Sequence, residues 1–137
     1  MADDRWSELC DQWEKDGYDS LSRPEKTWLN IRTLIDSIEN GGAISYFYNS
    51  GADTLADCLE DLRILEAASV RAQVERVAGL FPEGVPGDIE ARNAIIVAWP
   101  DEEVEPLLEE VDDELMPLMS SLEQRLDEFL ERSGLAT

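Results

Sequence analysis

The 137-residue chain contains no histidine, and this absence removes much of enzyme chemistry. Histidine is the commonest general base, and Ser–His and Cys–His nucleophile pairs and most zinc and iron sites require it. The Glu-x-x-His pairs of helical di-iron proteins are excluded for the same reason. The chain also lacks Gly-x-x-x-x-Gly-Lys, Gly-x-Gly-x-x-Gly and the Asp-x-Asp-x-Asp-Gly order of a calcium loop.

These absences predict no metal site, no cofactor and no catalytic residue. A hydrolase with two carboxylates stays open, because a set of 32 acidic residues always includes close pairs. Nothing distinguishes one pair from the others, so the chain is not expected to be an enzyme.

Cysteine and long apolar segments are scarce as well. Cys10 and Cys58 are the only cysteines, and both fall in helical patterns, which favours reduced thiols over a disulfide. The chain opens with Met-Ala-Asp-Asp-Arg, without the apolar segment of a signal peptide. No apolar run approaches the roughly 18 residues that a membrane span needs. We therefore expect a soluble, cytoplasmic protein.

Positive charge is the third deficit. Against 32 acidic residues stand 11 basic ones, of which Lys15 and Lys26 are the only lysines, and the net charge is −21. A field of this sign repels nucleic acids and anionic membranes and attracts basic protein surfaces. The expected partner is therefore a basic protein surface, with no direct nucleic acid or membrane contact. The alternative is that the charge serves solubility or adaptation to high salt.

What the chain does contain is a helical pattern along most of its length. Hydrophobic residues make up 43% of the chain, enough for a core. The length predicts a single domain over residues 1–137, with an N-terminal helix and linker at 1–21 and a core at 22–132. The fold class is all-α, a compact domain of about seven helices including short ones. The expected helices span about 3–16, 23–40, 54–66, 70–81, 89–99, 101–114 and 121–132.

Residues near the helix starts predict the caps. Ser22 with Glu25, and Ser120 with Glu123, have the spacing of capping boxes. Further expected N-caps are Asp53, Ser69 and Asp88.

Two apolar segments predict burial. Trp6, Leu9, Cys10 and Trp13 recur at helical spacing, which predicts an inward stripe. Residues 94–98 are apolar all round, which is typical of a strand or a fully buried helix, and the cap at Asp88 favours the helix.

Residues 40–51 concentrate three aromatic residues between two turn signals. The set comprises Asn40, Gly41, Gly42, Tyr46, Phe47, Tyr48, Asn49 and Gly51. Glycine and asparagine tolerate positive φ angles, so they set the turns. The aromatic residues are expected to anchor the neighbouring helices in the core. The alternative is a ligand site made of Tyr46 and Tyr48.

This stretch resembles the signature of the bacterial DNA-mimic-protein family, in the order Asn-Gly-Gly, a short gap, Tyr-Phe-Tyr-Asn-Ser and a nearby glycine. The resemblance extends over roughly residues 20–132. Its further parts are residues 28–39, 55–65, 77–82, Arg92 and 111–115. It implies an all-helical fold, a homodimer and, for at least one member, action as a decoy for DNA.

Residues 101–114 hold nine carboxylates and no basic residue. In a helix, Val104, Leu107, Leu108, Val111 and Leu115 would share one arc, and the acids would occupy the rest. A 14-residue helix is about 21 Å long, so it would carry about one charge per 2.3 Å. Duplex DNA carries about one per 1.7 Å of its axis. The expected partner-binding residues are Glu102, Glu103, Glu105, Glu109, Glu110, Asp112, Asp113 and Glu114.

Two prolines qualify this helix. Pro106 predicts either a start near Glu105 or a kink, and Pro117 predicts a break before the next helix. Acidic residues on neighbouring helices are expected to assist in binding: Asp57, Glu60, Asp61, Asp127, Glu128 and Glu131.

The leading hypothesis is an acidic protein-binding module that mimics DNA. It would occupy the basic DNA-binding surface of a bacterial transcription factor or nucleoid protein and so regulate transcription. The alternatives are an immunity or antitoxin-like protein that neutralises a toxin, and a helical domain whose charge serves solubility. A dimer contact is expected near Trp99 or on the C-terminal helix.

Overall fold

The computed structural model describes residues 2–135, and this part of the chain is entirely helical apart from turns. It holds eight α-helices and three short 3-10 helices, with no strand, which confirms the all-α fold class. The α-helices are α1 (Ala2–Asp16), α2 (Arg23–Gly41), α3 (Ala43–Tyr48), α4 (Leu55–Ile64), α5 (Ala68–Ala78), α6 (Ile89–Val97), α7 (Asp101–Leu115) and α8 (Met119–Arg132). The 3-10 helices are η1 (Tyr18–Ser20), η2 (Ser50–Thr54) and η3 (Met116–Leu118).

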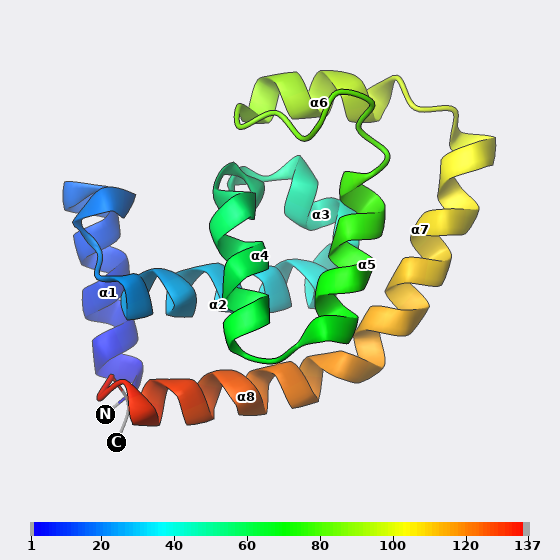
Figure 1. The fold of residues 1–137 in the computed structure, drawn as a ribbon. Coiled ribbons are helices and arrows are strands. Elements are labelled where there is room, and N and C mark those ends of the chain that lie inside the picture. Colours follow the sequence, from blue (N-terminus) through cyan, green and yellow to red (C-terminus); the bar gives the residue numbers. More distant parts are fainter. Residues whose placement is uncertain (1, 136–137) are drawn as a thin grey trace.

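Helix α2 is the centre of the fold, and it packs against α3, α4 and α8. Helices α4 and α5 form a pair joined by a short turn, α6 crosses above α3, and α7 descends on the side opposite α1 (Figure 1). Helix α8 then runs back toward α1, where Arg5 Nη1 donates a hydrogen bond to the Gly134 carbonyl at 2.7 Å. Helices α7 and α8 therefore form much of the outer surface.

The core follows the apolar spacing of the sequence. On α2, Ile31, Leu34, Ile35 and Ile38 are at most 1% exposed, and they lie on one face because they recur every three or four residues. Each such burial contributes about 1.5–3 kcal/mol relative to an exposed side chain. Equivalent rows on α7 and α8, including Val111 and Leu122, close the core from the outside.

The start of α2 confirms the first predicted capping box. The Glu25 amide donates to Ser22 Oγ at 3.2 Å, and the Ser22 amide donates to the Glu25 carboxylate at 2.8 Å. Asp88 also caps as predicted, because its side chain accepts a hydrogen bond from the Ala91 amide at 3.1 Å.

Three other predicted caps are wrong, because the chain enters these helices in another way. Helix α4 follows directly from η2, and Asp53 is held by Arg92 at 2.7 Å. Helix α5 starts at Ala68, so Ser69 already lies inside it. Helix α8 starts at Met119 after η3, whose Met116 carbonyl accepts the Met119 amide. The pair Ser120 and Glu123 therefore lies within a continuing helical path.

Helix α7 does not start near Glu105. It begins at Asp101, and the carbonyl of Pro100 accepts the first amides, from Glu103 and Val104. Pro106 is tolerated inside the helix because it faces solvent, where water can satisfy the carbonyl that lacks an intrahelical donor. The break predicted at Pro117 is confirmed by η3 between α7 and α8.

Two burial predictions are wrong. Residues 94–98 lie in a helical segment as expected, but this segment is not fully buried. Helix α6 covers α3 from outside, so Val97 is 68% exposed, and the buried residue of α6 is Arg92. Trp13, placed in the inward stripe, is 41% exposed, because α1 lies at the edge of the fold and only part of its apolar face meets α2. Leu9 and Trp6 do face inward, and the Trp6 and Trp28 rings lie 5.4 Å apart.

Candidate functional site

Helix α7 presents an anionic outer face because its apolar residues all turn inward. Val104, Val111 and Leu115 are buried and Leu107 and Leu108 are half-buried, packed against α5 and α3. This confirms the predicted amphipathic arc. The carboxylates occupy the remainder of the helix surface.

Seven of the eight predicted partner-binding carboxylates are exposed to solvent. They are Glu102, Glu103, Glu105, Glu109, Glu110, Asp113 and Glu114. Glu110 forms an ion pair with Arg76 of α5, with 3.4 Å between Nη2 and Oε1. The other six form no ion pair with residues of the described chain. A strip of uncompensated negative charge therefore runs along α7.

The strip does not depend on a flexible loop. Residues three or four positions apart on a helix lie about 5–6 Å from one another, so Glu102, Glu105, Glu109 and Asp113 form one row. Their backbone is fixed by the inward row of α7 and by the opening turn at Pro100. Such a row can bind a line of arginine or lysine side chains with little reorganisation.

Asp112 has a different role from the rest of the run. Its carboxylate is half-buried and accepts a hydrogen bond from the Ala43 amide at 2.8 Å, which places a negative group at the start of α3. Gly42 permits this approach: its φ angle is 83°, and a Cβ there would lie 2.5 Å from Asp112 Oδ2. Asp112 is therefore occupied within the fold, joining α7 to the glycine pair that precedes α3.

The Gly42–Asp112 contact predicts a matched pair of stability effects. Gly42→Ala should lower the free energy of unfolding by about 1–3 kcal/mol, because the new Cβ meets Asp112 and the φ angle is unfavourable for alanine. Asp112→Ala should cost about 0.5–2 kcal/mol through loss of the cap. Asp113→Ala, one residue away on the exposed side, should leave the urea midpoint unchanged. If Asp113→Ala destabilised as much as Asp112→Ala, the capping role would be wrong.

Within residues 40–51, the aromatic anchor is confirmed for two of the three rings. Tyr46 and Phe47 are each 1% exposed and meet edge to face with 5.3 Å between centroids. Phe47 then contacts Phe81, which contacts Trp99. Tyr48 is 39% exposed, so its predicted core position is wrong, because it points away from the face of α3 that packs. Because Tyr46 is buried and Tyr48 is exposed, the two rings do not line one open ligand site.

Arg92 fixes the end of that stretch. The side chain is fully buried and donates to three carbonyls: Nε to Phe47 at 3.0 Å, Nη1 to Pro86 at 3.0 Å and Nη2 to Asn49 at 2.9 Å. Nη2 also pairs with Asp53 at 2.7 Å. One guanidinium thus joins the exit of α3, η2 and the loop before α6. The sequence contains no local signal for this role.

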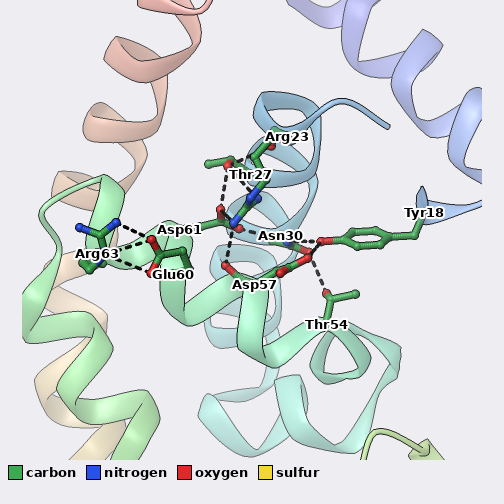
Figure 2. A network of polar contacts seen from close by, with 9 residues as sticks. All are labelled: Tyr18, Arg23, Thr27, Asn30, Thr54, Asp57, Glu60, Asp61 and Arg63. Carbon is green, nitrogen blue, oxygen red and sulfur yellow. Dashed lines mark hydrogen bonds and ion pairs between the residues drawn. The ribbon is translucent and has the colours of Figure 1, made fainter. Parts of the chain in front are cut away.

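A second polar network lies between η1, α2 and α4 (Figure 2). Asp61 is fully buried and accepts hydrogen bonds from Thr27 at 2.7 Å and Asn30 at 3.0 Å, and it pairs with Arg23 at 2.7 Å. Tyr18 donates to Asp57 at 2.6 Å. Asp61 therefore cannot contact a partner, so its predicted assisting role is wrong: the sequence pattern placed it among exposed acids, but packing of α4 on α2 encloses it.

The other predicted assisting residues lie nearer the surface. Glu60 is paired with Arg63, and Asp57 is engaged by Tyr18. Asp127, Glu128 and Glu131 of α8 are exposed. Of the acidic residues predicted to bind or assist, the exposed ones thus lie on α7 and on the outer face of α8.

Asp61 predicts a pH-dependent contribution to stability. Burial raises its pKa above 3.8, against the hydrogen bonds from Thr27, Asn30 and Arg23 that lower it. The folded state then holds this proton at higher pH than the unfolded state, so Asp61 favours folding most below 3.8 and loses that contribution as pH rises through its folded pKa. Urea unfolding of the parent and of Asp61→Asn is measured at a series of pH values. The free energy of unfolding of the parent minus that of Asp61→Asn should fall as pH rises. A pH-independent difference would contradict this assignment.

No group of three or more acidic or cysteine side chains in residues 2–135 is placed to hold a metal ion. No helix among those residues is long and apolar enough to cross a membrane.

Comparison with known proteins gives one match. The model of the family described as DMP19-like protein matches residues 19–133. No curated protein and no solved structure matches the chain.

Proposed function

We propose, from the premise that this chain belongs to the DMP19-like protein family, that it is an acidic protein-binding module acting as a DNA mimic. Its target would be the basic DNA-binding surface of a transcription factor or nucleoid protein, and the outcome would be regulation of transcription. The activity is binding, with no catalysis. The single observation that carries the proposal is the strip of exposed, uncompensated carboxylates on α7.

The mechanism is electrostatic competition. Glu102, Glu105, Glu109 and Asp113 form a rigid row, and arginine and lysine side chains that otherwise contact phosphates would pair with it. The net charge of −21 steers a basic partner toward the protein before contact. Both the charge pairing with the row and the long-range steering weaken as salt screens them, because the Debye length is about 10 Å at 0.1 M.

Affinity purification from the native host at low salt, about 50 mM, tests the proposal, because exposed charge pairs are least screened there. A recovered DNA-binding protein should lose its DNA in proportion to added mimic, measured by a fluorescence-anisotropy competition assay. Recovery of no DNA-binding protein would contradict the proposal. Recovery of a toxic enzyme without DNA affinity would favour the immunity or antitoxin-like function instead.

We also propose a homodimer whose contact includes α6. Ala94 and Val97 of α6 and its C-cap residue Ala98 recur at i, i+3 and i+4, and all three are exposed, which leaves an apolar stripe on the outer side of the last turn of this helix.

A charge placed in this stripe should dissociate the dimer. Val97→Glu is expected to convert a dimer to a monomer in light scattering coupled to gel filtration, because burying an unpaired carboxylate in an apolar contact is unfavourable. The matched control is Ala56→Glu, which adds the same charge at an exposed position of α4 and should leave the dimer intact. A monomeric parent protein would contradict the dimer proposal.

A further inference from the structure

A small pocket of about 150 Å³ lies beside residues 40–51, away from α7. Trp13 and Tyr18 from the N-terminal segment, Leu29 and Thr33 from α2, and Ser50 and Asp53 from η2 contribute to its lining. Pockets that bind drug-sized molecules and cofactors have volumes of about 300–1,000 Å³. This one has room for a single side chain.

Two aromatic rings line the pocket, and one of them, Tyr18, is held in place by hydrogen bonds. The Tyr18 hydroxyl donates to Asp57 at 2.6 Å and accepts from Asn30 Nδ2 at 2.9 Å, so the ring has a fixed position (Figure 2). Trp13 leaves 41% of its surface exposed, which is unusual for the largest apolar side chain. Because the Tyr18 ring is held before binding, a ligand would lose little free energy in ordering it.

The chemistry of the lining favours a cation with an apolar stem. Aromatic faces attract ammonium and guanidinium groups, and in this chain Lys26 Nζ already lies 4.9 Å from the Tyr18 ring centroid. Asp53 is partly exposed and lines the pocket, where it contributes an acidic side chain whose Oδ1 is engaged by Arg92. Leu29 and Thr33 supply surface for methylene groups, which arginine and lysine bury while their charged ends stay polar.

We infer that this pocket accepts one long basic side chain, an arginine or a lysine, from the protein partner. The inference rests on the proposed function for the existence of a basic partner. It adds a specific anchoring point on the side of the molecule away from α7. The contacts on α7 are charge pairs, whereas the pocket would also recognise the shape of the side chain. A side chain seated there would distinguish partners that carry a protruding basic residue from those that are merely basic.

The pocket's preference is testable without any partner. N-acetyl-arginine amide, titrated into the ¹⁵N-labelled protein, should shift the Trp13 indole and Gly51 amide signals and saturate in the millimolar range. The citrulline analogue has nearly the same shape without the charge, and it should bind at least about tenfold more weakly. The spectrum of Trp13→Phe identifies the indole signal among the four tryptophans.

Two variants test whether the chemical-shift changes arise from binding in this pocket. Ser50→Phe adds a ring at an exposed lining position and should abolish the shifts while the rest of the spectrum stays folded. Neutralising Glu102, Glu105, Glu109 and Asp113 on α7 should leave arginine binding in the pocket intact, although it would weaken the proposed DNA mimicry. Absence of shifts, equal binding of citrulline, or unchanged shifts in Ser50→Phe would each overturn the inference and leave the α7 proposal to its own test.

Discussion

Replacing Arg92 with alanine is expected to lower the free energy of unfolding by about 3–5 kcal/mol, because the substitution removes a fully buried charged donor and leaves its partners unpaired. The carbonyls of Phe47, Asn49 and Pro86 would each lose their donor. A buried polar group without a partner costs about 1–3 kcal/mol. Domains of this size are stable by about 5–15 kcal/mol, so much of the folded state's margin would be lost.

Two further substitutions separate hydrogen bonding from packing at Arg92. Arg92→Met restores much of the volume but no donor, so it should remain strongly destabilised, because three of the four acceptors are backbone carbonyls that no side-chain change removes. Arg63→Ala is the control: Arg63 is 61% exposed and pairs with Glu60 at the surface, so its urea midpoint should barely change. An Arg92→Met variant as stable as the parent would mean that the four hydrogen bonds contribute nothing.

Neutralising the row on α7 is expected to have the largest effect on binding. The variant Glu102→Gln, Glu105→Gln, Glu109→Gln, Asp113→Asn changes the net charge from −21 to −17, since four carboxylates are removed. At about 0.5–1 kcal/mol for each exposed charge pair, the partner should bind roughly 30- to 1,000-fold more weakly. Association should slow, and the dependence of affinity on salt should become shallower.

The same variant should lose binding without losing stability. Like charges three or four residues apart on a helix repel one another, so removing them should leave the protein as stable as the parent or more stable. Loss of binding with retained stability separates a contact role from a structural one.

The control for the α7 variant carries the same net charge of −17. Asp4→Asn, Glu8→Gln, Glu66→Gln and Glu83→Gln neutralise four exposed residues that lie outside α7, outside α8 and outside the pocket of Trp13 and Tyr18. Isothermal titration at two salt concentrations should show a small loss of partner affinity for this control variant and a large loss for the α7 variant. Equal losses would mean that overall charge, and not the α7 row, attracts the partner.

Features that depend on near neighbours in the chain are predictable from the amino-acid sequence. The all-α class and the amphipathic character of α7 follow from apolar residues every three or four positions. The cap of α2 joins Ser22 and Glu25, only three residues apart, and it was predictable for the same reason. A periodic pattern also suffices to place most of the carboxylates on one outer face, because the inward row leaves them no other side of the helix.

Which polar residues are engaged inside the fold depends on how distant helices pack against one another. Asp112 meets Ala43 across 69 positions of sequence, Arg92 meets Phe47 across 45, and Asp61 meets Asn30 across 31. No local pattern marks such contacts, because they arise when packing brings distant helices together. The exposure of Trp13 and of α6 was missed for the same reason: apolar residues predict a buried face, but the number of neighbouring helices available to cover it is a property of the whole fold.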